Sequence, residues 1–305
     1  MTSTSDTNSL DPRLNAFRPD LADERLAGKV EAHRFVAGWR AQVARAVIAM
    51  RSRPEGMAGL VNEALYGERL RVFEIAQGWA WMQLERDGYV GYVPADTLAL
   101  DIVEPAHRIQ AIGTFVYPAA DIKAPPMMHL SLGAEVLVTG GDETFLRLSS
   151  GGFVVARHVA PRTRTALDFV EVAERFIGVP YLWGGRTRIG LDCSGLVQLA
   201  LEAAGHASPR DSDMQQAALG KPVAIPADLV SESADNLDSL ERGDLVFWPG
   251  HVGIMVDGVL LLHANAHHMA VVIEPLVSAS GRIAKSGSAI TAIKRLAKPP
   301  ARSGV

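Results

Sequence analysis

The spacing of hydrophobic positions predicts a small β-barrel in the first third of the chain. Residues 45–98 contain short apolar or alternating runs, AVIAM, RLRVFEI, GWAWMQL and YVGYV, separated by turn residues. One of these turns contains Asp87-Gly88, a dipeptide that suits a tight hairpin. We therefore predict an antiparallel barrel over 43–100, preceded by an arm, 1–42, with a short helix in VEAHRFVAGWRAQ.

A weak internal repeat predicts a second barrel. ALYGERLRV (64–72) aligns with LSLGAEVLV (130–138), and DGYV (87–90) aligns with GGFV (151–154). Matching glycines and apolar positions at a similar offset are typical of two copies of one fold. The second copy is expected over 101–160, although β-rich segments can also resemble one another by chance.

The remaining pattern, 163–300, predicts an α+β domain. ALDFVEVAERFI has apolar residues at helical spacing, with Thr165 as its cap and Gly178 at its end. A more buried helix is expected in CSGLVQLALEAAG. The runs DLVFWP, HVGIMV, VLLLHA, AVVIEPL and ITAIKRL predict successive strands. Helices followed by an antiparallel sheet are typical of this fold class, and residues 221–240 are either a lid or a connector.

Composition and charge exclude several classes of protein. The 305 residues are 48% hydrophobic and 21% charged, which indicates a globular chain. Thirty basic and 34 acidic residues give a net charge of −4, without the basic surface that nucleic acids or anionic lipids require. No basic segment followed by an apolar run opens the chain, and no stretch approaches roughly 18 apolar residues. We expect no signal peptide, no membrane span and a cytoplasmic location.

Cys193 is the only cysteine, so an intrachain disulfide and a multi-thiolate metal site are excluded. It lies in the first turn of the more buried predicted helix. The unpaired N–H groups and the dipole of a helix N-terminus favour a thiolate, which would lower the pKa of the thiol. The alternative is an inert, buried cysteine. A nucleophile would need a base nearby.

Two of the nine histidines, His251 and His263, lie inside consecutive apolar strands of the domain that carries Cys193. If they share a face of the sheet, His251 can take the thiol proton while His263 binds its far nitrogen and orients the ring. A neutral histidine lacks the charge of a carboxylate, so the helix dipole would have to stabilise the ion pair.

The turn between these strands decides whether the two rings meet. If Met255 pairs with Val259 across a three-residue loop, with Gly258 in the left-handed position, the histidines lie directly opposite each other. A two-residue turn would pair Val256 with Val259 and place the rings on opposite faces.

These motifs resemble the NlpC/P60 cysteine peptidases of bacterial cell-wall peptide, preceded by bacterial SH3 domains. The resemblance rests on PYLWGGRTRIGLDCSGLVQ, RGDLVFWPGHVGIMV and LLLHANA, and covers about 163–297. It implies a papain-like domain in which Cys193 is the nucleophile, His251 the base and His263 the third polar residue. Tyr181 corresponds to a tyrosine near the oxyanion, with packing as its alternative role. No cofactor is implied.

The resemblance also implies a substrate, the γ-D-glutamyl bond to meso-diaminopimelate or lysine in peptidoglycan stem peptides. Two SH3 modules before the peptidase are similar to the subgroup that requires a free L-alanine amine. Such a pocket would serve short peptides released during wall recycling. Its candidate residues are Asp192, Ser194, Asp211, Ser212, Glu63 and Tyr89. Glu63 as a solvated charge and Asp211 as a helix cap are the alternatives.

Other interpretations remain open at this point. The protein could be an exported DL-endopeptidase of intact wall, or a catalytically idle SH3 protein that binds wall peptides. His263, His267 and His268 could suggest zinc, but a strand at His263 and the lack of a suitably spaced carboxylate favour no metal. Trp79 and Trp81 are expected in the barrel core rather than in a ligand groove. Arg210 could pair with a substrate carboxylate or with Asp211, and the pair with Asp211 is preferred.

Overall fold

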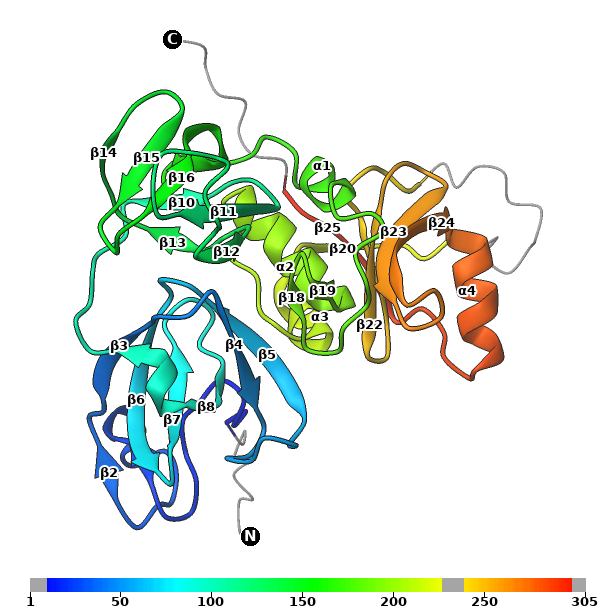
Figure 1. Cartoon of the computed structure of the whole chain (residues 1–305). Helices are drawn as coiled ribbons and strands as arrows, with labels where there is room; N and C mark the ends of the chain where they lie inside the picture. Colours follow the sequence, from blue (N-terminus) through cyan, green and yellow to red (C-terminus); the bar gives the residue numbers. More distant parts are fainter. Residues whose placement is uncertain (1–9, 227–238, 298–305) are drawn as a thin grey trace, which may run out of the picture. The chain divides into compact units, whose positions relative to one another are not determined.

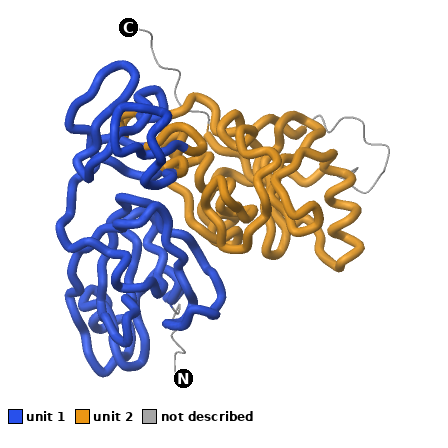
Figure 2. Tube along the Cα trace, in the orientation of Figure 1, with its two compact units in different colours: residues 1–108, 114–130, 134–159 blue, residues 109–113, 131–133, 160–305 orange. Residues whose placement is uncertain are grey.

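The computed structural model describes residues 10–226 and 239–297. The chain divides into two compact units (Figure 2). Unit 1 contains most of residues 1–159, and unit 2 contains residues 160–305 with two short segments, 109–113 and 131–133. The predicted fold class, two small barrels followed by an α+β domain, is confirmed by the strands and helices described below.

The first module of unit 1 is a seven-stranded sheet with the order β5-β4-β8-β7-β6-β3-β9 (Figure 1). Its strands are β3 (Trp39–Val43), β4 (Val47–Arg51), β5 (Leu60–Leu65), β6 (Arg69–Ala76), β7 (Trp79–Leu84), β8 (Val90–Pro94) and β9 (Leu98–Ala99). The 3₁₀ helix η2 (Ala95–Thr97) connects β8 to β9. Asp87-Gly88 lies in the loop 85–88 and not in a two-residue turn, since Leu84 N–H donates to the carbonyl of Tyr89.

The expected helix in VEAHRFVAGWRAQ is wrong. These residues form β2 (Phe35–Val36), which pairs with β1 (Ala22–Asp23), and β3, which pairs with β6. Ala41 pairs with β6 and Val43 with β9, and both are buried, so tertiary contacts override the local pattern. The arm also contains η1 (Glu24–Leu26).

The arm packs onto the first sheet through apolar contacts. Ala16 and Leu21 form a buried cluster with Phe73 and Trp81. Trp81 is thus a core residue, whereas Trp79 is partly exposed. These contacts join residues of the arm to β6 and β7 in one hydrophobic core.

The second module repeats the local geometry of the first. Gly67 and Gly133 occupy matching positions of the repeat and have φ of +80° and +87°, while Gly88 and Gly152 have +75° and +81°. Only glycine adopts this region at little cost. The strands are β10 (His107–Ile109), β11 (Gly113–Tyr117), β12 (Met128–Ser131), β13 (Glu135–Val136), β14 (Val138–Gly141), β15 (Phe145–Leu148), β16 (Phe153–Val155) and β17 (Val159–Pro161). Like η2 in the first module, η3 (Ala156–His158) connects the last two strands.

Unit 2 contains a six-stranded antiparallel sheet with the order β20-β25-β21-β22-β23-β24. Its strands are β20 (Lys221–Val223), β21 (Leu245–Trp248), β22 (His251–Met255), β23 (Leu260–Asn265), β24 (Ala270–Pro275) and β25 (Ala292–Arg295). A small ribbon, β18 (Arg186–Thr187) and β19 (Gly190–Leu191), precedes the buried helix α2 (Cys193–Ala203). Helix α2 packs against β22 and β23.

Three further helices complete unit 2: α1 (Phe169–Glu174), α3 (Ser212–Ala218) and α4 (Leu276–Lys285). Helix α1 is shorter than predicted, because Asp168 rather than Thr165 caps it by accepting the N–H of Val170. Helix α4 was not predicted. Its Ser- and Gly-containing sequence has low helix propensity, but Leu276 and Ala279 are fully buried against the sheet.

The 221–240 segment is only partly described. Residues 221–223 form β20, which pairs with β25. Residues 227–238 lie outside the described residues, so the choice between a lid and a connector stays open. Within 10–226 and 239–297, no helix has the length and apolar character needed to cross a bilayer.

Candidate active site

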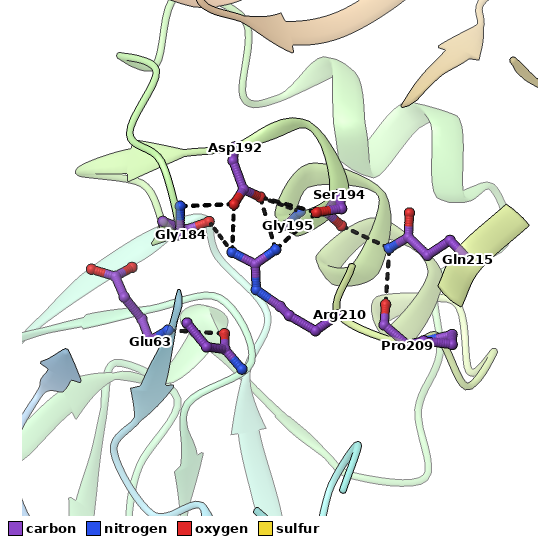
Figure 3. Close-up of polar contacts among 10 residues, drawn as sticks. Glu63, Gly184, Asp192, Ser194, Gly195, Pro209, Arg210 and Gln215 are labelled. Carbon is purple, nitrogen blue, oxygen red and sulfur yellow. Dashed lines mark hydrogen bonds and ion pairs between the residues drawn. The ribbon is translucent and has the colours of Figure 1, made fainter. Parts of the chain in front are cut away.

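A buried ion pair holds the loop that precedes α2 (Figure 3). Asp192 is the N-cap of α2, and its Oδ1 accepts the N–H of Gly195 at 2.7 Å. Its Oδ2 accepts the N–H of Gly184 at 2.8 Å. Arg210, 1% exposed, donates to Oδ1 at 2.9 Å and to Oδ2 at 2.7 Å. A bidentate, charge-assisted pair of this kind fixes both position and orientation, so the loop is held rigidly against the start of the helix.

The guanidinium of Arg210 binds Asp192, and its expected pairing with Asp211 stays a prediction. Both oxygens of Asp192 accept hydrogen bonds from the protein. This carboxylate therefore holds the loop in place. Ser194 is part of the same network, because its Oγ accepts from Arg210 at 2.9 Å. Gln215 of α3 donates to the backbone carbonyls of Ser194 and Pro209, each at 2.9 Å.

Glycines allow the loop to approach the helix closely. A Cβ at Gly195 would lie 2.4 Å from the carbonyl oxygen of Gly185, and a Cβ at Gly185 would lie 2.6 Å from that of Gly190. Both distances are well below van der Waals contact, and the atoms approached belong to the backbone, which cannot turn aside. Glycine at positions 185 and 195 therefore has a steric reason.

Cys193, at the first position of α2, is 6% exposed. Burial, followed by the negative charge of Asp192, raises the pKa of the thiol to about 12. The expected lowering by the helix N-terminus is wrong for this state of the protein, because removal from water outweighs the favourable N–H groups. A backbone hydrogen bond from Val252, on β22, to the sulfur also lowers the pKa in part. The sulfur thus lies beside β22, at the residue that follows His251 in the chain.

The two histidines meet, in a register that differs from both expectations. Nε2 of His251 lies 2.8 Å from Nδ1 of His263. Ile254 pairs with Leu262 and Met255 with Leu261, so the histidines share a face as diagonal neighbours and are not directly opposite.

The turn explains this register. Val256 N–H donates to the carbonyl of Leu260, which closes a loop of Asp257, Gly258 and Val259. The Asp257 carboxylate accepts the N–H groups of Val259 and Leu260 at 2.8 and 2.7 Å. The turn is thus closed by hydrogen bonds to the Asp257 side chain. The expected loop needed Gly258 in the left-handed conformation instead, and Gly258 does not have a positive φ.

A carboxylate and an arginine lie behind His263, and neither was predicted. Nε2 of His263 lies 2.8 Å from Oε1 of Glu274, and Arg282 donates to Oε2 at 2.7 Å and to Oε1 at 2.5 Å. Glu274 is the single charged residue in the apolar run AVVIEPL, a signal that could have identified it. Arg282 lies on the unpredicted helix α4, so no local signal pointed to it.

Both histidines are kept neutral at physiological pH. Burial lowers the pKa of His251 to about 3, with a further contribution from the charge of His263. Burial also lowers the pKa of His263, against the opposing influence of Glu274. A neutral imidazole with an available nitrogen can accept a proton, so His251 is in the form that a general base requires.

Tyr181 is held near the start of α2 by backbone contacts. Its N–H donates to the carbonyl of Met269, and it forms an isolated bridge with Leu191. Burial, then the charges of Cys193 and Asp192, raise the pKa of the phenol to about 12. The hydroxyl therefore keeps its proton and can donate it to a developing oxyanion.

The remaining predicted substrate residues are divided between the units. Asp211 and Ser212 begin α3 in unit 2, and the Asp211 side chain makes no capping hydrogen bond. Glu63 lies on β5 and Tyr89 just before β8, both in unit 1 and both buried. Their meeting in one pocket stays a prediction.

His267 and His268 lie in the turn between β23 and β24, and both are exposed in part. Among residues 10–226 and 239–297, no group of three or more His, Cys, Asp or Glu side chains could hold a metal ion.

Comparison with known proteins links both parts of the chain to one group. A match to the NlpC/P60 family covers residues 178–281, and a match to the bacterial dipeptidyl-peptidase Sh3 domain covers 50–98. The chain is 35% identical over 233 residues to the gamma-D-glutamyl-L-lysine dipeptidyl-peptidase of Bacillus subtilis, which covers 67% of this chain and 71% of that protein. It is 26% identical over 238 residues to dipeptidyl-peptidase 6 of Lysinibacillus sphaericus, covering 70% and 83%.

A solved structure supports the fold. The crystal structure of an NlpC/P60 family protein from Bacillus cereus has a TM-score of 0.67 at 17% identity, and the similarity covers 84% of this chain and 99% of that one. At this identity the likeness concerns the fold alone.

Proposed function

Since the chain belongs to the NlpC/P60 family, we propose that it is a cysteine peptidase that hydrolyses the γ-D-glutamyl-L-diamino acid bond of peptidoglycan stem peptides. The observation that carries this proposal is the placement of the only cysteine at the start of α2, beside the strand of His251, whose ring is hydrogen-bonded to His263. The name of the Bacillus subtilis relative supplies the bond.

The proposed reaction is acyl transfer to water through a thioester. His251 accepts the thiol proton as the sulfur attacks the carbonyl carbon of the γ-D-glutamyl group. Because burial favours the neutral thiol and the neutral imidazole, proton transfer accompanies attack. The backbone N–H of Cys193 and the hydroxyl of Tyr181 donate to the oxyanion. His251 then returns the proton to the leaving amine, and water hydrolyses the thioester.

We further propose that the substrates are short muropeptides with a free N-terminal L-alanine, cleaved in the cytoplasm during wall recycling. Two observations support this. The relatives that align with most of the chain are named dipeptidyl-peptidases, a class that removes two residues from a free N-terminus. The chain also carries acidic candidates, Glu63 and Asp211, for binding a protonated amine. The alternative is an exported DL-endopeptidase.

The requirement for a free amine gives a direct test. L-Ala-γ-D-Glu-L-Lys and its meso-diaminopimelate analogue should be hydrolysed at least about 100-fold faster than the same peptides with an acetylated N-terminus, because acetylation removes the positive charge. Release of the diamino acid, followed by chromatography, measures both rates. Equal rates for free and blocked peptides would exclude the amine pocket, and activity on intact sacculi alone would exclude recycling.

Glu63→Gln and Asp211→Asn should raise KM for the free peptide while changing kcat little, since they weaken capture of the amine. Glu55→Gln, which removes an exposed carboxylate of the same barrel, is the matched control. If the two variants lower kcat at unchanged KM, these residues do not bind the amine.

The orientation of the base gives a second test. His263→Ala should lower kcat by about 100-fold and leave KM within about threefold of wild type, because it disturbs the ring of His251 and not the binding of the substrate. His206→Ala, at the opposite end of α2 from Cys193, controls for the loss of an imidazole. A rise in KM with unchanged kcat would assign His263 to substrate binding instead.

A further inference from the structure

A diagonal line of polar side chains crosses three neighbouring strands of unit 2. The register of β22 and β23 places His251 and His263 on one face. In the next pair of strands, His263 pairs with Val272 and Leu261 with Glu274, so Glu274 lies on the same face, again as a diagonal neighbour. Two hydrogen bonds of 2.8 Å connect the three side chains in order.

Helix α4, beside β24 (Figure 1), covers this face and ends the line with a positive charge. Leu276 and Ala279 anchor the helix to the same hydrophobic cluster as Leu261. Arg282, three residues after Ala279, donates to both oxygens of Glu274. The carboxylate therefore has a fixed orientation and cannot turn away from His263.

Glu274 is ionised in this environment. Burial opposes ionisation, but hydrogen bonds from Arg282 and His263 outweigh it and hold the pKa of the carboxyl far below its usual range. The partly exposed His268 is a further titratable group close to it, and its Nδ1 lies 3.9 Å from Oε1. An ionised carboxylate can only accept hydrogen bonds, so the Nε2 atom of His263 must carry a proton.

We propose that Glu274, held by Arg282, is a positioning residue that sets the tautomers of both histidines and directs an unprotonated nitrogen of His251 to the thiol. In neutral His263, protonation of Nε2 leaves Nδ1 as an acceptor. Nδ1 then accepts from Nε2–H of His251. The neutral ring of His251 is left with Nδ1 unprotonated. This inference rests on the proposed function, in which His251 takes the thiol proton.

Without the carboxylate, the pair of histidines is ambiguous. Nδ1–H of His263 could donate to Nε2 of His251, and the proton of His251 would then lie on Nδ1, where no further proton can be accepted. Glu274 removes this unproductive arrangement. Its charge also stabilises the imidazolium that forms as the thiol is deprotonated, in the way that an aspartate does in other triads.

Two variants separate these effects. Glu274→Ala removes the acceptor and the charge, and should lower kcat by about 10- to 100-fold with KM within about twofold of wild type. Glu274→Gln keeps an amide oxygen that can accept from His263, and should retain more activity than the alanine variant. A common loss for both variants would mean that the charge alone matters, and no loss in either would overturn the proposal.

The tautomers can be observed without any substrate. Long-range ¹H–¹⁵N spectra of histidine-labelled protein, assigned with His251→Ala and His263→Ala, should show Nε2 protonated and Nδ1 unprotonated in both rings at neutral pH. In Glu274→Ala the two forms should become mixed. Protonated Nδ1 of His263 in the wild type would overturn the proposal even if the enzyme is active. Failure to cleave the muropeptide, with the expected spectra, would instead refute the proposed function alone.

A matched control keeps loss of folding apart from loss of positioning. Glu174→Ala removes the carboxylate that binds Arg242 with hydrogen bonds of 2.8 and 3.0 Å, on α1 of the same unit. It should leave kcat and the histidine spectra unchanged. If Glu174→Ala and Glu274→Ala reduce kcat equally, the effect of Glu274 is general destabilisation, and the proposal fails.

Discussion

Cys193→Ala should reduce hydrolysis of L-Ala-γ-D-Glu-L-diamino acid peptides by at least about 10⁴-fold. The sulfur forms the covalent bond in the proposed thioester, and removal of a nucleophile costs far more than removal of an orienting group. No other cysteine exists in the chain to replace it. Steady-state release of the diamino acid, measured with enough enzyme to detect a 10⁴-fold loss, tests this expectation.

The same variant separates an enzyme from a binding protein. Cys193→Ala should bind the peptide about as tightly as wild type, because the substitution removes only the sulfur atom and leaves the Cβ in place. If the variant turns over at the wild-type rate, Cys193 is not the nucleophile. If wild type binds wall peptides but neither it nor any variant cleaves them, the tandem barrels act in recognition alone.

Arg210→Ala should lower the free energy of unfolding by about 3 to 5 kcal/mol. The guanidinium is almost completely buried, and it donates to both oxygens of Asp192 and to Oγ of Ser194. Removing it leaves a buried carboxylate without its countercharge at the N-cap of α2, which is costlier than the loss of the contacts themselves. Urea unfolding followed by fluorescence, with the midpoint and slope fitted together, measures the change.

An exposed ion pair of the same unit provides the comparison. Arg242→Ala removes contacts to Asp168 and Glu174 whose side chains are about a third exposed, so the loss should stay within about 1 kcal/mol. Arg210→Lys should be intermediate, because lysine retains the charge without the bidentate fork. Equal losses for Arg210→Ala and Arg242→Ala would contradict a special role of the buried pair.

Local patterns predicted most strands and the buried helix correctly. They failed where contacts with distant segments of the chain override the local preference. Period-two runs identified β6 and β7 because each strand presents its own alternating face. The segment 30–42 also has helical features, but β3 pairs with β6 and β9 and Ala41 is buried, which decides in favour of a strand. Helix α4 has weak propensity and forms because the sheet buries Leu276 and Ala279.

The amino-acid sequence alone determined which groups are available: one thiol at the head of an apolar helix, and two histidines whose even separation lets them share a face. These features follow from local sequence, because a helix start and the separation of two residues are set by residues near them in the chain. Tertiary structure decided the register through the Asp257 carboxylate, recruited Glu274 and Arg282, and kept the Cys193 thiol protonated. Register, burial and electrostatic environment depend on segments far apart in the chain, and these meet only after folding.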